Sequence, residues 1–207
     1  AHWATKEGYF KGQILPISIK QRRQMISFEK DEHIRSDATA ESMAKLRTVF
    51  KEDGSVTAGN ASGLNDAASA IILMERSKAE KGSKEILGRL VGYAHSGVDP
   101  KYMGIGPVPA IQKCLESTGL TVKDMDVIEL NEAFAAQALA VARDLNLPMD
   151  RTNPNGSGIS LGHPIGATGC LITVKLLYEL KRIQGRYGLV SMCIGGGQGI
   201  AAIFERV

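Results

Sequence analysis

GATGCLITVKLLYELKRIQGRYGLVSMCIGGGQGIAAIFE, residues 166–205, holds one long helical pattern followed by two strand patterns. Apolar residues recur at helical spacing over 166–183, which predicts a long helix. Two short apolar runs, at 189–194 and 200–205, predict strands, and GGGQG between them predicts a glycine turn. A helix that leads into two such strands indicates an α/β domain.

The same alternation extends toward the N-terminus. Apolar runs predict strands at 86–94 and 127–130, and helical spacing predicts helices at 108–117 and 133–145. Strands that alternate with helices predict one layered α/β domain from about residue 86 to residue 207.

Residues 1–85 are less regular and contain little that could close a core alone. We therefore expect the chain to be a fragment that opens within a helix. The expected elements are a strand at 13–19 near Pro16, a helix at 39–50, a turn at 51–54, a loop at 56–66, a buried strand at 67–74 and a polar helix at 77–81.

The composition is that of a globular protein, with 43% hydrophobic and 23% charged residues. The net charge of +3 is too small to indicate a nucleic-acid partner, and no apolar run reaches the roughly 18 residues of a membrane span. The Lys20–Arg23 cluster is either a solvated face or an anion site. Three cysteines without a CxxC pair fit a reducing compartment, and no secretory signal pattern opens the chain, so we expect a cytoplasmic protein.

Function is expected where glycine is concentrated, since 11 of the 23 glycines lie between Gly156 and Gly199. In GISLGHPIGATG, residues 158–169, a histidine lies between two glycine-flanked turns. Pro164 stiffens the backbone beside His163, and the following helix presents free N–H groups to an anionic oxygen. His163 is therefore a candidate catalytic residue, and the alternative is a structural histidine in a tight turn.

Cys193 ends a predicted strand and faces GGG, whose backbone N–H groups can form a concavity that binds an anion. Such surroundings can lower the pKa of the thiol and make Cys193 useful in proton transfer or nucleophilic attack. The alternative is a small buried hydrophobe, which is also what we expect of Cys114 and Cys170.

Asn131 lies where a predicted strand passes into a helix, so it is either a helix N-cap or a ligand for a catalytic water. Glu129 and Glu132 beside it are capping acids, orienting acids or surface charges. The scattered histidines and cysteines give no metal-ligand spacing, and neither glycine loop completes a nucleotide-binding motif.

Five motifs occur in order along the chain: VTAGNASGLNDAA (56–68), YMGIGPVPA (102–110), NEAFAAQ (131–137), NPNGSGISLGHPIGATG (153–169) and CIGGGQGIA (193–201). With them the chain resembles the thiolase family, and within it the acetyl-CoA acetyltransferases and broad-range β-ketothiolases. The resemblance implies the thiolase fold, a layered α/β structure with a mixed sheet between helices. It also implies Claisen condensation of acyl-CoA, or thiolysis of 3-ketoacyl-CoA, through an acylated cysteine.

The resemblance covers only the C-terminal half of a thiolase, and no cysteine here matches the motif of the nucleophile. It implies that the N-terminal half, in the same or a separate chain, supplies that cysteine, and that this polypeptide alone is inactive. Residues 1–63 would end the loop region over coenzyme A, 64–85 would return to the N-terminal domain, and 86–207 would form the C-terminal domain. Coenzyme A would be a substrate, with no prosthetic group, and the enzyme a homodimer or homotetramer.

Four residues match catalytic positions of the family. His163 would activate the nucleophile and help to hold the thioester oxygen, together with a water fixed by Asn131. Cys193 would move the proton of the acetyl α-carbon, and the N–H of Gly195 would belong to a second oxyanion site. Donors placed where negative charge develops are what enolate chemistry requires.

Eight further residues match positions that line the coenzyme A site. Those along the pantetheine arm are Ser62, Ala58, Leu64, Met103, Ala133 and Phe134, and those near the adenosine diphosphate end are Arg35 and Ser42.

Two other functions remain open on the sequence. One is a non-catalytic acyl-CoA or lipid-binding module of thiolase ancestry, which has no need of His163 and Cys193 together. The other is a decarboxylating or ketoacyl synthase of the wider superfamily. Those enzymes resemble this fold but generally use a His/His or His/Asn set, so Cys193 argues against them.

Overall fold

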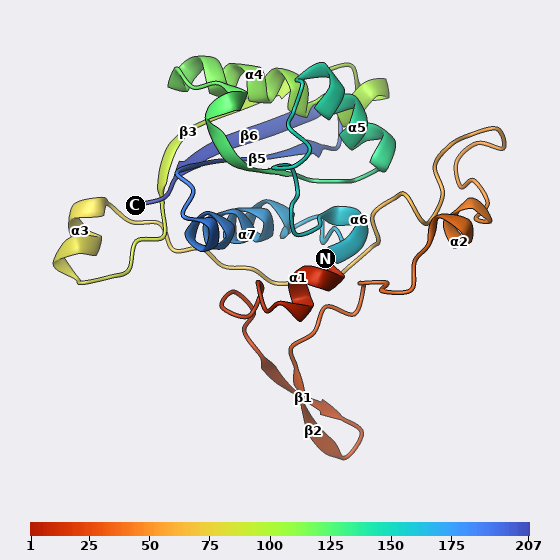
Figure 1. The fold of residues 1–207 in the computed structure, drawn as a ribbon, viewed down its shortest axis with the longest axis horizontal. Helices are drawn as coiled ribbons and strands as arrows, with labels where there is room; N and C mark the ends of the chain where they lie inside the picture. The colour runs from red at the N-terminus through yellow and green to blue at the C-terminus, as the bar shows by residue number, and fades with distance from the viewer.

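A four-stranded sheet forms the centre of the computed structural model, which describes all 207 residues (Figure 1). Its strands are β3 (Arg89–Gly97), β4 (Met125–Leu130), β5 (Tyr187–Ile194) and β6 (Gln198–Glu205), in the order β3-β6-β5-β4. β4 and β5 are parallel, whereas β6 pairs antiparallel with β5 and β3. The sheet is therefore mixed, as expected.

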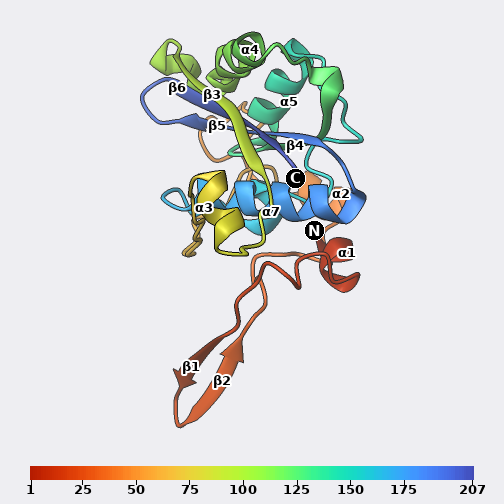
Figure 2. The same ribbon diagram turned by 90° about the vertical axis from the view of Figure 1, so that its left-hand side faces the viewer.

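Helices cover both faces of the sheet. α4 (Pro107–Thr118) and α5 (Ala135–Asp144) lie on one side, and α7 (Thr168–Ile183) lies on the other (Figures 1 and 2). The side chains of Ile111 and Ile128 belong to the cluster beneath α4, and that of Leu176 belongs to the cluster beneath α7. This arrangement confirms the layered α/β class and the long helix, strand and strand at the C-terminus.

Three short helical segments complete this part of the chain, and the sequence patterns did not predict them. They are the 3₁₀ helices η1 (Pro100–Ile105) and η2 (Val122–Asp124) and the helix α6 (Gly158–Leu161). α6 matters for the site, because it ends one residue before the GHP motif.

The N-terminal part is extended and largely exposed. α1 (His2–Lys6) is followed by a hairpin of β1 (Ile17–Gln21) and β2 (Gln24–Phe28), which projects away from the rest (Figure 2). The basic cluster at 20–23 covers the exposed end of β1 and the turn at Arg22 and Arg23, where Arg22 has φ 56°. The strand predicted at 13–19 is thus shifted, and its partner was missed.

The predicted helix at 39–50 is wrong over most of its length. Only α2 (Ala40–Ala44) is helical, and the chain turns at Lys51–Gly54 as expected. α3 (Arg76–Lys81) confirms the predicted polar helix.

The prediction of a buried strand at 67–74 is also wrong. This apolar segment has no secondary structure, and the exposed fractions of Ile72 and Leu73 are 84% and 79%. A strand forms only against a neighbour whose backbone N–H and C=O groups pair with its own, and no segment of this chain takes that place.

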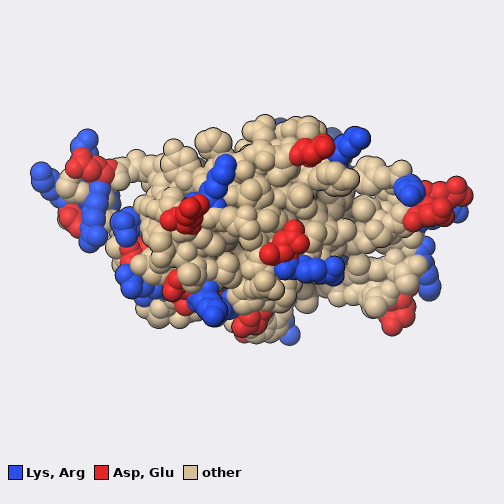
Figure 3. All heavy atoms as spheres, turned by 90° about the horizontal axis from the view of Figure 1, so that it is seen from above, with Lys and Arg blue, Asp and Glu red and all other residues tan.

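The face seen from above carries acidic and basic side chains close together, and much of it is uncharged (Figure 3). No helix of the structure has the length and apolar character needed to cross a bilayer.

Candidate active site

The carboxyl ends of the parallel strands β4 and β5 meet at one edge of the sheet, where ligands of α/β proteins usually bind. Asn131 directly follows β4 there and is fully buried, and its backbone N–H donates to the carbonyl of Ser191 at 2.9 Å. Its Nδ2 lies 3.3 Å from Nε2 of His163. The N-cap alternative is excluded, since α5 begins at Ala135 with Phe134 as its N-cap.

His163 is held both through its backbone and through its ring. Its N–H donates to Oδ1 of Asn65 at 3.1 Å, and its Nδ1 lies 2.7 Å from the hydroxyl of Thr168. Gly162 before it has φ 104°, a left-handed conformation that glycine adopts without strain. Burial lowers the pKa of the His163 imidazole, which favours the neutral ring at physiological pH.

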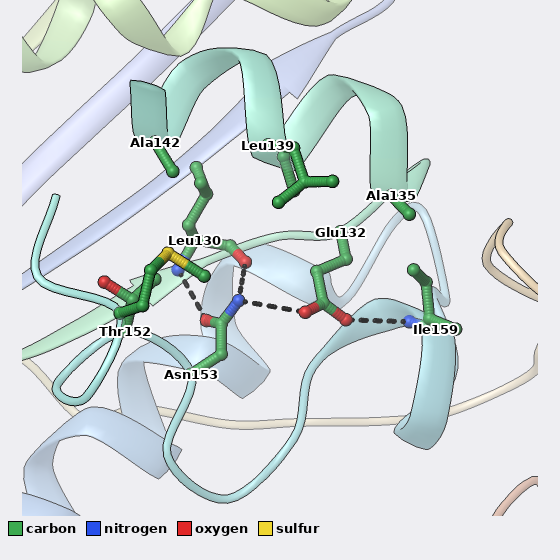
Figure 4. Close-up of a pocket in the computed structure, with 10 residues that line it drawn as sticks. Leu130, Glu132, Ala135, Leu139, Ala142, Thr152, Asn153 and Ile159 are labelled. Atoms are coloured by element: carbon green, nitrogen blue, oxygen red, sulfur yellow. Dashed lines mark hydrogen bonds between the residues drawn. The ribbon is translucent and has the colours of Figure 1, made fainter. Parts of the chain in front are cut away.

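The segment that carries His163 is fastened to the end of β4 by side-chain hydrogen bonds (Figure 4). Asn153 accepts from the N–H of Leu130 and donates to its carbonyl, both at 2.8 Å. One carboxylate oxygen of Glu132 accepts from Asn153 Nδ2, and the other accepts from the N–H of Ile159, each at 3.3 Å. Glu132 therefore caps the first turn of α6, to which Ile159 belongs, and also orients Asn153, so two of the three roles open for it apply and a surface charge does not.

A shallow hollow lies beside this network, between α5 and the 149–159 segment. The side chains that line it are mostly apolar and come from both sides (Figure 4); they include Leu130, Ala135, Ala138, Leu139, Ala142, Met149 and Ile159.

Glu129 is neither a cap nor a surface charge. It lies fully buried on β4, and its Oε2 accepts from Nζ of Lys175 on α7 at 2.8 Å. Lys175 also donates to the carbonyl of Gly156, ahead of the GHP motif. Burial raises the pKa of the Glu129 carboxyl, and the nearby Lys175 ammonium opposes that shift.

Cys193 lies at the end of β5, buried, and pairs with Gly199 of β6. Burial raises the pKa of its thiol, so the expectation of a lowered value is wrong. The glycines after Cys193 form the predicted turn at 195–197, in which Gly196 and Gly197 have φ near 88°. Gly195 is exposed, and no atom lies within 4 Å of the position a Cβ would take there.

The loop at 56–66 joins several of the predicted coenzyme A residues to the catalytic candidates. Ser62 donates its N–H to the carbonyl of Ala133 at 3.0 Å, Ala61 pairs with Phe134, and Leu64 pairs with His163. Despite its pairing, the side chain of Leu64 is 94% exposed.

The remaining predicted coenzyme A residues lie on this loop, on η1 and in the region of α2. Ala58 is exposed on the same loop, and Met103 is half-buried on η1. Arg35 is exposed ahead of α2. Ser42 lies on α2, where its hydroxyl accepts from the N–H of Thr39 at 3.0 Å and donates to the Thr39 carbonyl at 2.9 Å. No hydrogen bond joins Arg35 or Ser42 to the group around His163.

Three residues that touch the site went unnoticed in the sequence. Asn65 and Thr168 hold His163, and His33 approaches Asn65, with its Nδ1 3.4 Å from Asn65 Nδ2 and its Nε2 3.1 Å from the carbonyl of Ile159. Asn65 and Thr168 lie inside the motifs quoted above, but nothing in their spacing distinguishes them. The structure contains no cluster of three or more His, Cys, Asp or Glu side chains that could hold a metal ion.

Comparisons with known proteins identify the family and the fold. The family model described as thiolase, C-terminal domain, matches residues 84–206, and that described as thiolase, N-terminal domain, matches residues 1–77. Among curated proteins, the beta-ketothiolase BktB of Cupriavidus necator is 66% identical over 205 residues, which is 99% of this chain and 52% of that protein.

Solved structures show the same relation. The Bacillus anthracis acetyl-CoA acetyltransferase superposes with a TM-score of 0.98 at 53% identity, over 100% of this chain and 52% of that one. The human mitochondrial 3-ketoacyl-CoA thiolase in complex with CoA gives 0.91 at 46% identity, over 100% and 51%. The chain thus spans about half the length of the relatives it matches. By sequence and by fold, it belongs to the thiolase family.

Proposed function

We propose that this chain provides the C-terminal half of an acetyl-CoA acyltransferase. That enzyme would condense acyl-CoA by Claisen chemistry, or cleave 3-ketoacyl-CoA with coenzyme A. The observation that carries the proposal is the contact between Asn131 and His163 at the sheet edge where β5 delivers Cys193. The nucleophilic cysteine would come from the N-terminal half, in the same or a separate chain.

In this proposal His163 is the base for the nucleophile. Its neutral imidazole, favoured by burial, accepts the thiol proton of the cysteine in the other half. The thiolate then attacks the thioester carbonyl. The developing oxyanion is held by His163 and by a water on Asn131, whose Oδ1 is buried without a partner in the chain.

Cys193 would move the second proton. Its raised pKa keeps it a thiol at rest, the form that can protonate the α-carbon of the departing enolate during thiolysis. In the condensation direction the same sulfur must accept that proton. The N–H of Gly195, an exposed residue of the turn that follows β5, would face the enolate oxygen.

Coenzyme A enters as substrate, with no prosthetic group. Ser62 is joined to Ala133 by a backbone hydrogen bond, and Leu64 is paired with His163 in a β-bridge. These contacts support a binding path for the pantetheine arm that ends at the proposed catalytic histidine. Arg35 is an exposed cation suited to a phosphate of the nucleotide end.

Two observations support a complementary half. The chain spans about 52% of the relatives that it matches, and the apolar segment at 67–74 is exposed. Association of complete enzymes into dimers or tetramers is a further part of this proposal.

The test uses the enzyme assembled from both halves. Incubation with acetyl-CoA should add one acetyl group to the cysteine of the N-terminal half, as seen by intact mass. Cys193→Ala should abolish condensation and largely spare this acylation, with Cys170→Ala as a control that changes neither. Equal loss of both steps in Cys193→Ala would refute the role of Cys193. Coenzyme A binding by calorimetry without any turnover would instead favour a non-catalytic binding module.

A further inference from the structure

The hydroxyl of Thr168 lies between two partners in the catalytic turn. Thr168 begins α7 and is buried, and its Oγ1 lies 2.7 Å from Nδ1 of His163 and 2.9 Å from the carbonyl oxygen of Pro164. The first turn of α7 holds that carbonyl in place, since the N–H groups of Ala167 and Thr168 also donate to it, at 2.7 and 2.9 Å.

The direction of these two hydrogen bonds follows from the proton count. A hydroxyl has one hydrogen to donate, and a carbonyl oxygen can only accept. If the Thr168 hydrogen pointed to His163, Oγ1 and the Pro164 oxygen would face one another at 2.9 Å with no hydrogen between them. The hydroxyl therefore donates to Pro164 and accepts from His163, which places the imidazole hydrogen on Nδ1.

We infer that Thr168 is a positioning residue that fixes His163 in the tautomer protonated on Nδ1, leaving the lone pair of Nε2 free as the basic atom. Which nitrogen of a histidine carries the proton is set by the hydrogen bond that the other nitrogen makes. Nε2 has no protein partner except Nδ2 of Asn131, at 3.3 Å. That amide is nearly equidistant from Nδ1, at 3.5 Å, so it lies alongside the ring.

The consequence for catalysis rests on the proposed function. A base toward a thiol must present an unprotonated nitrogen, and in the opposite tautomer Nε2 would carry a hydrogen and could not accept. Thr168 would thus act through His163 without touching the substrate.

The direct test is the ¹⁵N NMR spectrum of the protein labelled in its histidines, recorded above pH 7, with the His163 signals identified by their loss in His163→Gln. The inference expects a protonated Nδ1 and an unprotonated Nε2. Thr168→Val, which has the same shape without the hydroxyl, should shift the tautomer ratio toward protonated Nε2 on the order of tenfold, the factor that an ordinary hydrogen bond is worth. Thr168→Ser should restore the native spectrum.

A native spectrum with hydrogen on Nε2 would overturn the inference, even if Thr168→Val failed to fold. An unchanged tautomer in a folded Thr168→Val protein would overturn it too. The spectrum reports the imidazole whether or not the protein turns over acyl-CoA, so failure of the thiolase activity and failure of this inference remain distinct. In the assembled enzyme, Thr168→Val should lower kcat with little change in the KM for coenzyme A, and Thr168→Ser should recover kcat.

Discussion

The backbone N–H of His163 donates to Oδ1 of Asn65 across 3.1 Å, although 98 positions separate the two residues. This bond and the pairing of Leu64 with His163 join the loop at 56–66 directly to the catalytic turn. His33 adds to this link, because its ring approaches both Asn65 and the carbonyl of Ile159. The loop that carries the proposed coenzyme A residues Ser62 and Leu64 is thereby joined to the proposed base, whereas no hydrogen bond extends from this group to Arg35.

Asn65→Ala should loosen the catalytic turn. It leaves the half-buried N–H of His163 without its acceptor, which costs about 1–3 kcal/mol of unfolding free energy. Hydrogen exchange of the His163 amide should accelerate, and a denaturant titration should show the lower stability. Asn65→Asp keeps the acceptor oxygen and is the matched control, in which the His163 amide stays protected. Equal protection in Asn65→Ala and the native protein would contradict the bond.

Alanine should destabilise the protein at one glycine of this motif and leave it nearly unchanged at another. Gly162 has φ 104°, and a Cβ there would lie 2.6 Å from the side chain of Asn65, so Gly162→Ala adds strain of roughly 1–3 kcal/mol and pushes Asn65 away. Gly166 has no atom within 4 Å of its Cβ position, so Gly166→Ala should stay within about 0.5 kcal/mol of the native protein. The free energies of unfolding of the two variants are compared with that of the native protein by thermal or urea unfolding. Similar losses in both would mean that the turn is not constrained as described.

Lys175→Met should be among the most destabilising changes near the site. It leaves the buried Glu129 carboxylate without its charged partner. Removing one partner of a buried ion pair lowers the free energy of unfolding by about 3–5 kcal/mol. Glu129→Leu with Lys175→Met removes both charges and should recover much of that loss. The comparison is made by urea unfolding at pH 7, and a double variant no more stable than the single one would argue against stranded charge as the cause.

The same variant should also depend on pH in a defined direction. Burial raises the pKa of Glu129 above its unfolded value, and the Lys175 ammonium opposes that rise. Without Lys175 the pKa rises further, so the folded variant holds the proton more tightly than the folded native protein does. Stability from such a group is present at low pH and is lost as pH rises through the folded pKa. The deficit of Lys175→Met relative to the native protein should therefore shrink as the pH is lowered.

The sequence patterns were sufficient where a segment's partners lie close along the chain. Helix α7 and strands β5 and β6 follow one another along the chain and pack together. The helix and the two strands predicted from their periodicity are therefore the elements that form. The apolar run at 67–74 has the length and composition of a buried strand, yet it is exposed because a strand also needs a neighbour. Periodicity describes one segment and contains no information on whether that neighbour exists.

The same distinction separates the site residues that the sequence predicted from those that it did not. Glycine and proline around His163, and the end of a buried strand at Asn131, gave local signals that pointed to both residues. Nothing local predicted Asn65, because its role arises from a contact across 98 positions. The raised pKa of Cys193 was missed for a related reason: the glycines were visible in the sequence, whereas the burial that dominates the shift depends on the packed sheet.

His163 should make the native protein sensitive to acid. Burial lowers its pKa below the unfolded value of about 6.5, so the unfolded state binds the proton more tightly. The free energy of unfolding therefore falls as the pH drops through the unfolded pKa toward the lower folded one. The difference in unfolding free energy between the native protein and His163→Gln should decline between pH 7.5 and pH 5. Groups common to both proteins cancel in this comparison. A difference independent of pH would show that the imidazole is not kept neutral by its surroundings.

The exposed segment at 67–74 should be a contact surface for the complementary half in the proposed enzyme. Leu73 is 79% exposed, so Leu73→Lys should leave the unfolding free energy of this chain within about 0.5 kcal/mol of the native value. In the assembly the same change would forfeit burial of a leucine, about 1.5–3 kcal/mol, which weakens association on the order of 10- to 100-fold. Leu139→Lys on α5, also at an exposed leucine, is the control for added charge. The affinity for the N-terminal half is measured by titrating it against each variant. Of the two leucines, only Leu73 belongs to the exposed apolar segment at 67–74. Equal affinities for Leu73→Lys and Leu139→Lys would therefore show that this segment is not the contact surface.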